Sequence, residues 1–90
     1  MYSLEYTDDA RADMQRLKRN DPQAFRKLAV LLAELMEHPR TGTGRPEALR
    51  GDRAGQWSRR ISGRHRLIYA IRDTEVVVLV LRSYGHYDDK

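Results

Sequence analysis

The chain is organised around Gly42–Tyr69, which reads GTGRPEALRGDRAGQWSRRISGRHRLIY. The first half of this stretch is rich in glycine and typical of a loop. The second half predicts two short strands, Trp57–Ile61 and His65–Ile71, on either side of a turn. Seven arginines and only two acids lie between Arg45 and Arg66, which gives this segment a local charge of +5. The stretch therefore predicts a strongly basic hairpin of strands.

The segments that flank this hairpin complete a predicted sheet. Val76–Arg82 predicts a further strand after a turn at Arg72–Thr74, and consecutive short turns indicate an antiparallel meander. Because Val76–Leu81 is apolar on both faces, we expect it inside the sheet and not at an edge. Arg40–Gly55 has the composition of a loop without regular structure of its own, a length that is typical of functional or disordered loops.

The amino-terminal part of the chain predicts a strand followed by two helices. Met1–Tyr6 alternates between aromatic or apolar and polar residues, as a half-buried strand does. A first helix is expected over Asp8–Arg19 with Thr7 as its N-cap. A second helix is expected over Pro22–His38 with Asp21 as its N-cap, because proline favours the first helical position. The two helices form an antiparallel hairpin with apolar residues toward the core, so the fold class is α+β.

Length and composition restrict the class of protein. Ninety residues make one domain, 1–90. The absence of cysteine excludes disulfides and fits the cytoplasm, which is the expected location. We find no apolar run near the roughly 20 residues that cross a bilayer, and no signal peptide. A pI of about 9.8 and fourteen arginines indicate a polyanionic partner.

Two arginines of the hairpin are expected to face each other. If the loop Ser62–Arg64 has three residues, Arg60 lies opposite Arg66; a two-residue turn would instead place them diagonally. Like charges in this arrangement repel, and a bound phosphate would supply the missing counter-charge. The alternatives are a solvated basic strand, or pairing of the arginines with the acids Asp8, Asp9, Asp88 or Asp89.

Glu47 and His86 add acid–base groups to this basic region. Arg45 and Arg50 beside Glu47 favour its ionised form, which can accept a proton. RNA is cleaved without a metal when a base activates the 2′-hydroxyl, an acid protonates the departing 5′-oxygen and cations hold the phosphorane. Either residue could also be an ordinary solvated side chain. We expect no metal site, because the three histidines lack ligand spacing, and no other cofactor.

Four motifs in order resemble a known family. They are GTGRPEAL at Gly42–Leu49, GQWSRRI at Gly55–Ile61, HRLIY at His65–Tyr69 and GHY at Gly85–Tyr87. Together they are similar to the YoeB (Txe) toxins of bacterial toxin–antitoxin modules, within the RelE superfamily. The resemblance covers nearly the whole chain. It implies two amino-terminal helices packed on a twisted, mainly antiparallel sheet of about four strands, the RelE-like or microbial-ribonuclease-like fold.

The resemblance also implies an activity: metal-independent, ribosome-dependent cleavage of messenger RNA in the ribosomal A site. By motif, Glu47 resembles the general base, His86 the general acid and Arg66 the arginine that stabilises the transition state. Arg60 and Tyr87 resemble substrate contacts. Arg50, another substrate contact, stands where the family commonly has lysine, so the charge is kept.

Partners follow from the same resemblance. It implies a homodimer, a YefM-like antitoxin that is acidic and partly disordered, and binding of operator DNA only as the toxin–antitoxin complex. No membrane partner is expected. The alternatives are a non-catalytic relative that acts as a gyrase-directed toxin, a plain RNA-binding module, and a nuclease that ignores the ribosome.

Overall fold

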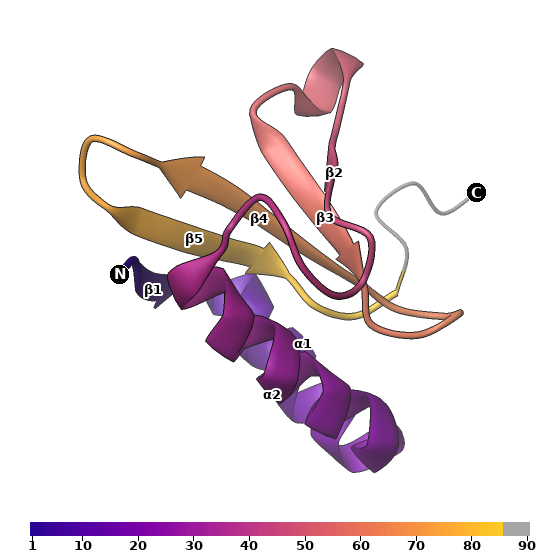
Figure 1. Cartoon of the computed structure of the whole chain (residues 1–90). Helices are drawn as coiled ribbons and strands as arrows, with labels where there is room; N and C mark the ends of the chain where they lie inside the picture. Colours follow the sequence, from indigo (N-terminus) through magenta and orange to yellow (C-terminus); the bar gives the residue numbers. More distant parts are fainter. Residues whose placement is uncertain (86–90) are drawn as a thin grey trace.

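Two helices lie on one face of a five-stranded sheet (Figure 1). The computed structural model describes residues 1–85, so His86 and Tyr87 lie outside the described residues. The strand order is β1-β5-β4-β3-β2. The elements in chain order are β1 (Ser3–Tyr6), α1 (Asp8–Asn20), α2 (Pro22–Glu37), β2 (Glu47–Ala48), the 3₁₀ turn η1 (Gly51–Arg53), β3 (Gln56–Arg60), β4 (Arg66–Arg72) and β5 (Val77–Arg82).

Both helices begin at the predicted caps. The Thr7 hydroxyl accepts from the Ala10 N–H at 3.0 Å, and the Asp21 carboxylate accepts from the Ala24 N–H at 3.2 Å. The Thr7 hydroxyl also donates to the Leu81 carbonyl at 2.9 Å, so the start of α1 is joined to β5. The predicted helices are therefore confirmed, and their ends differ from the prediction by one residue at most.

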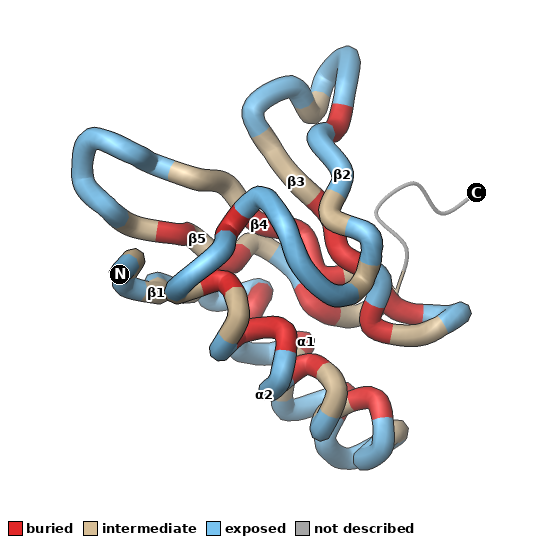
Figure 2. Tube along the Cα trace, viewed as in Figure 1, coloured by how far each residue is buried: buried red, intermediate tan, exposed pale blue. Residues whose placement is uncertain are grey.

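The core lies between the helix pair and one face of the sheet (Figure 2). Full burial of a leucine or valine side chain stabilises a fold by about 1.5–3 kcal/mol. Trp57 packs against this core from β3. The side chains that are almost fully buried there are Leu17, Leu28, Leu31, Leu35, Leu67, Tyr69, Val78 and Val80.

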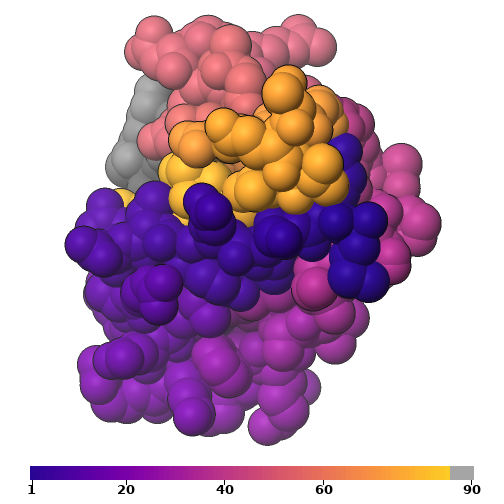
Figure 3. Space-filling view, turned by 90° about the vertical axis from the view of Figure 1, so that its left-hand side faces the viewer, coloured from indigo at the N-terminus to yellow at the C-terminus, as the bar shows by residue number. Residues whose placement is uncertain are grey.

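The expected number of about four strands is corrected to five by β2. β2 pairs antiparallel with β3, and the Leu49 N–H donates to the Gln56 carbonyl just beyond it at 2.9 Å. A strand of two residues has no period that a sequence can display, which is why Arg40–Gly55 reads as a loop without regular structure. The segment from β2 to β3 forms one end of the molecule, opposite the helices (Figure 3).

The sheet is mixed because β1 pairs parallel to β5, while its other pairs are antiparallel. Parallel neighbours need a long connection, and here nearly the whole chain lies between them. β5 is consequently an interior strand between β1 and β4, as its two apolar faces predicted.

The guanidinium of Arg59 is completely buried and uses all of its donors. Nε donates to the Tyr69 hydroxyl at 3.1 Å, and Nη1 donates to Glu34 Oε1 at 2.9 Å. The other donors reach three backbone carbonyls, those of His38, Thr41 and Thr43. Since arginine carries five N–H donors, this set satisfies every one. Arg59 thus joins β3, β4, the end of α2 and the loop after α2.

We expect Arg59→Leu to lower the free energy of unfolding by about 3–5 kcal/mol, because Glu34 and three carbonyls lose their buried partner. Urea unfolding measures this loss. The control Arg64→Leu removes an exposed arginine from the nearby hairpin loop and should change stability by less than about 0.5 kcal/mol. Equal unfolding midpoints for the two variants would show that the Arg59 network does not hold the fold together.

The same network predicts a loss of stability in acid. Hydrogen bonds from the Thr43 hydroxyl, the Thr43 N–H and Arg59 lower the pKa of Glu34. Its contribution is therefore full above the ordinary glutamate pKa of about 4.3 and is lost as pH falls through the lower folded value. Urea unfolding at successive pH values should show a smaller acid loss in Glu34→Gln than in the unaltered protein. Parallel curves for the two proteins would contradict this assignment.

Candidate active site

The strand register places Glu47, Arg60 and Arg66 on one face of the sheet. Glu47 pairs with Ser58 across β2 and β3, and Arg60 pairs with Arg66 across β3 and β4. Because side chains alternate along a strand, Ser58 and Arg60 share a face. Arg59 points to the opposite face, toward the helices, where it contacts Glu34. Three of the predicted site residues therefore gather on the face that the helices leave uncovered.

Arg60 and Arg66 are direct cross-strand neighbours, as the three-residue loop predicted. The Ile61 N–H donates to the His65 carbonyl at 3.0 Å, which closes the hairpin with Ser62–Arg64 as its loop and excludes the two-residue turn. Arg66 Nη1 donates to the Ser62 and His65 carbonyls at 2.9 and 3.3 Å. Within residues 1–85, neither Arg60 nor Arg66 forms an ion pair. The pair is thus suited to receive an anion.

Glu47 and Arg50 lie beside this pair at the edge of the sheet. Glu47 is exposed on β2, and Arg50 is exposed where the chain enters η1. Leu49 between them is buried and anchors the segment to β3 through its N–H. The edge strand therefore fixes the backbone that carries both side chains while leaving them open to solvent.

The chain after β5 is directed toward Arg66 by two anchors. Buried Asp13 of α1 accepts from Arg82 Nε at 2.8 Å and from the Ser83 N–H at 3.0 Å. At the second anchor, the Gly85 carbonyl accepts from the Arg66 N–H at 2.9 Å, and the Gly85 N–H donates to His65 Nδ1 at 2.9 Å. The last described residue is therefore held against the start of β4.

His65 has a role that the sequence did not reveal. Its ring is buried, packs on the Tyr84 ring with centroids 4.4 Å apart, and accepts the Gly85 N–H at Nδ1. An accepting Nδ1 leaves the proton on Nε2, which lies 3.9 Å from Asp21. We see no pattern in the sequence that identifies this contact, because His65 and Gly85 are far apart along the chain.

The basic hairpin that the sequence predicts includes Arg59, and the structure separates Arg59 from Arg60. One signal was present in the sequence. In a strand, alternation puts Trp57, Arg59 and Ile61 on one side and Arg60 on the other. Since Trp57 and Ile61 belong to the core, Arg59 belongs there too. His86 and Tyr87, the two remaining predicted site residues, lie outside the described residues.

The part of the chain that the structure describes brings together no group of three or more metal-ligating side chains. The same residues include no helix of the length and apolarity that a bilayer crossing requires.

Comparison with known proteins gives a consistent family. The family model described as YoeB-like toxin of bacterial type II toxin–antitoxin system matches residues 6–87. Toxin YoeB of Mycobacterium bovis is 38% identical over 84 residues, which cover 93% of this chain and 99% of that protein.

Solved structures agree with this match. A YoeB/ParE toxin from Agrobacterium tumefaciens superposes with a TM-score of 0.88 at 33% identity, covering 94% of this chain and 99% of that one. A chain of the heterotetrameric YoeB–YefM toxin–antitoxin complex from Staphylococcus aureus superposes with a TM-score of 0.81 at 27% identity, covering 97% and 99%.

The facing arginines should cost stability when no anion is bound. We expect Arg60→Gln to raise the free energy of unfolding by about 0.2–1 kcal/mol at low ionic strength, because a cross-strand repulsion is removed. The gain should shrink in high salt, which screens exposed charges. Urea unfolding with Arg26→Gln, an exposed arginine on α2, is the control. No gain relative to this control would mean that Arg60 and Arg66 are not in conflict.

Proposed function

The chain belongs to the YoeB-like toxins of bacterial type II toxin–antitoxin systems, and we propose that it is a ribosome-dependent endoribonuclease that cleaves messenger RNA in the ribosomal A site. The observation that carries this proposal is the register that puts Glu47, Arg60 and Arg66 on one uncovered face. A carboxylate beside two guanidiniums that form no ion pair within residues 1–85 matches the demands of phosphodiester cleavage.

Each residue has one task in the proposed reaction. Glu47 takes the proton from the 2′-hydroxyl, and the 2′-oxygen attacks the adjacent phosphorus. Arg66, supported by Arg60, stabilises the negative charge of the phosphorane. His86 gives a proton to the departing 5′-oxygen as the phosphorus–oxygen bond breaks. The products are a 2′,3′-cyclic phosphate and a free 5′-hydroxyl, and no step uses a metal or cofactor.

The anchoring of Gly85 supports the assignment of His86 as the acid. His86 follows Gly85 directly in the sequence, and Gly85 is hydrogen-bonded to the backbone N–H of Arg66. Tyr87 then serves as an aromatic contact to the substrate, and Arg50 serves as a phosphate contact beside Glu47.

The openness of the site supports dependence on the ribosome. Glu47 and Arg60 are both exposed, and a flexible RNA strand has many orientations on such a face. Holding reactants in a reactive geometry accounts for a large part of most catalytic rate enhancements. In this proposal the decoding site holds the codon rigidly and supplies the orientation that the toxin surface lacks.

The proposed partners follow the family. The Staphylococcus aureus relative was solved in a heterotetramer with YefM, and we propose a YefM-like antitoxin for this chain. An acidic antitoxin segment complements the net charge of +4 and the arginines of the uncovered sheet face. We further propose a homodimer, operator binding only by the toxin–antitoxin complex, and action in the cytoplasm, where the ribosomes are.

Primer extension on a defined message in a purified translation system tests this function. We expect a cut at the A-site codon that requires ribosomes, and a rate about 10²–10⁴-fold lower for Glu47→Gln because the general base is lost. Glu37→Gln, an exposed glutamate at the end of α2, is the matched control and should cleave normally.

Three results would contradict the proposal. Undiminished cleavage by Glu47→Gln would remove Glu47 from the mechanism. Cleavage of free RNA that gains nothing from ribosomes would make the chain an independent ribonuclease. A folded protein that cuts no RNA but induces a DNA-damage response in cells would indicate a gyrase-directed toxin.

A further inference from the structure

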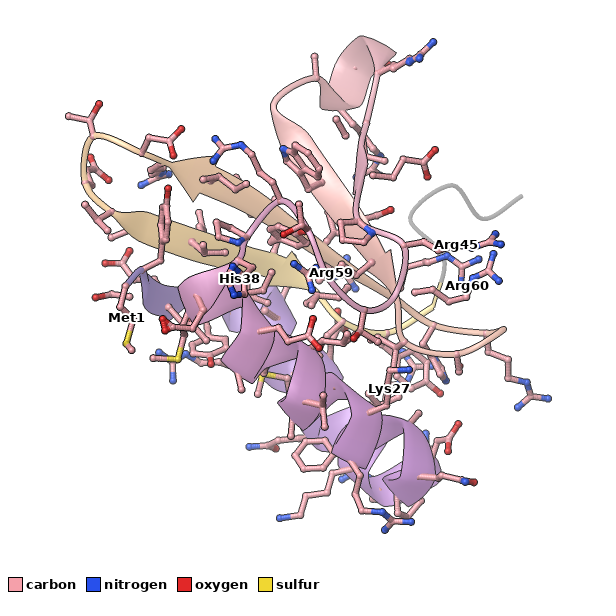
Figure 4. All side chains as sticks on the ribbon, viewed as in Figure 1. Met1, Lys27, His38, Arg45, Arg59 and Arg60 are labelled. Atoms are coloured by element: carbon pink, nitrogen blue, oxygen red, sulfur yellow. The ribbon has the colours of Figure 1, made fainter. Side chains whose placement is uncertain are left out.

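A second cationic feature lies beside the proposed active site. A hollow of about 380 Å³ opens where the end of β3 meets α2 and the loop before β2. Figure 4 shows Arg45 and Arg60 extending next to each other, and Lys27 projecting from α2 below them. The polar and glycine residues that line the hollow are Lys27, Gly44, Arg45, Arg60, Ser62 and Gly63.

Among the residues that the structure describes, no acid is paired with the charges of this hollow. Lys27, Arg45 and Arg60 come from three separate segments, and no acid is among the lining residues. Within residues 1–85, none of the three forms an ion pair. Asp21, which caps α2, lines the adjoining hollow together with Lys27, but the two form no ion pair. A concave site with three unpaired cations attracts an anion.

The backbone of this region is held in an unusual conformation that presents Arg45. Arg45 has φ of +54°, in the left-handed region that residues other than glycine rarely adopt. It also precedes Pro46, and a residue before proline is normally extended. Such local strain persists only where the surrounding structure imposes it, and it concentrates at binding sites.

Gly44 imposes this conformation. The Arg60 N–H donates to the Gly44 carbonyl at 2.6 Å, and a Cβ on Gly44 would lie 2.8 Å from the Arg60 carbonyl oxygen. Only glycine permits so close an approach. The loop is therefore fastened to the end of β3 directly before Arg45, so Arg45 and Arg60 are held together.

We propose that this hollow binds a backbone phosphate of the RNA strand, next to the phosphate held by Arg60 and Arg66; the inference rests on the proposed function. Arg60 belongs to both sites, and RNA carries a phosphate at every nucleotide, so the strand that crosses Arg60 brings a neighbouring phosphate to Lys27 and Arg45. The lining of the hollow favours RNA over an acidic peptide helix. The hollow is small and cationic, and it offers no stripe of exposed apolar side chains on which the apolar face of a helix could pack.

Binding of fluorescein-labelled single-stranded RNA of about 10 nucleotides tests this inference. All proteins carry Glu47→Gln, so that the RNA stays intact. We expect Lys27→Ala with Arg45→Ala to weaken binding several-fold. The slope of log affinity against log salt should become shallower by about 0.7, the contribution of one phosphate contact on a single strand.

The matched control is Arg26→Ala with Arg72→Ala. Both residues are exposed and lie outside the hollow, and each double substitution removes two positive charges, so the two double variants have the same formal net charge. The control should keep the original salt slope. Arg45→Gly provides a second test variant, because it removes the charge and relieves the left-handed backbone; it should remain folded and bind RNA more weakly.

Three outcomes decide between this inference and its alternatives. Equal losses in both double variants would overturn it, because net charge alone would then explain binding. It would also fall if binding of a polyglutamate peptide depended on Lys27 and Arg45 while RNA binding did not. If the unaltered toxin fails to cleave messages but only the hollow variants lose RNA affinity, the hollow stands as an RNA site and the nuclease proposal falls.

Discussion

The structure depends on one buried charge, the guanidinium of Arg59. Isolated, such a group would be very costly to remove from water, and here five acceptors surround it. Three of these are carbonyls of the segment that leaves α2, a segment with few apolar side chains to hold it. Without the Arg59 guanidinium, few contacts would hold the loop after α2 against β3. The positions of Gly44, Arg45 and the strand β2 all follow from this placement of the loop.

Two adjacent arginines of β3 have different roles because a strand places them on opposite faces. Arg59 and Arg60 are identical in type and neighbours in sequence, yet one is fully buried and the other is exposed. The period of two in a strand is enough to assign them to opposite faces. The face toward the helices holds the guanidinium whose donors are all used, and the other face holds guanidiniums that have no carboxylate partner among the described residues. The cost of leaving charges unpaired is thus confined to the face on which we propose that RNA binds.

Most of the architecture could be predicted because the relevant signals are local. Thr7 and Asp21 mark the helix starts by cap chemistry, and the loop Ser62–Arg64 fixes the hairpin register that pairs Arg60 with Arg66. β2 and the parallel pairing of β1 with β5 were not predicted, because a two-residue strand has no period and partner choice depends on the whole fold.

The candidate site was predictable to a similar degree. Glu47 lies on the same sheet face as Arg60 and Arg66 because β2 pairs with β3. The motif at Gly42–Leu49 suggests a role for Glu47, but it does not predict this strand. The contact of His65 with Gly85 joins residues that are distant in the chain and could not be foreseen. In the sequence, Lys27 has no feature that distinguishes it from other helix residues. It lies near Arg45 and Arg60 only because the loop before β2 and the end of β3 approach α2.

The parallel pairing of β1 with β5 has a consequence for how the protein folds. β5 is the interior strand that joins β1 to the rest of the sheet, and it is the last strand along residues 1–85. Its contacts with Thr7 and Asp13 join residues that lie far apart in the sequence. Such long-range contacts raise the entropic cost of loop closure and slow folding. The centre of this sheet therefore forms only after segments from both ends of the described chain have met, and we expect the toxin to fold slowly for its size.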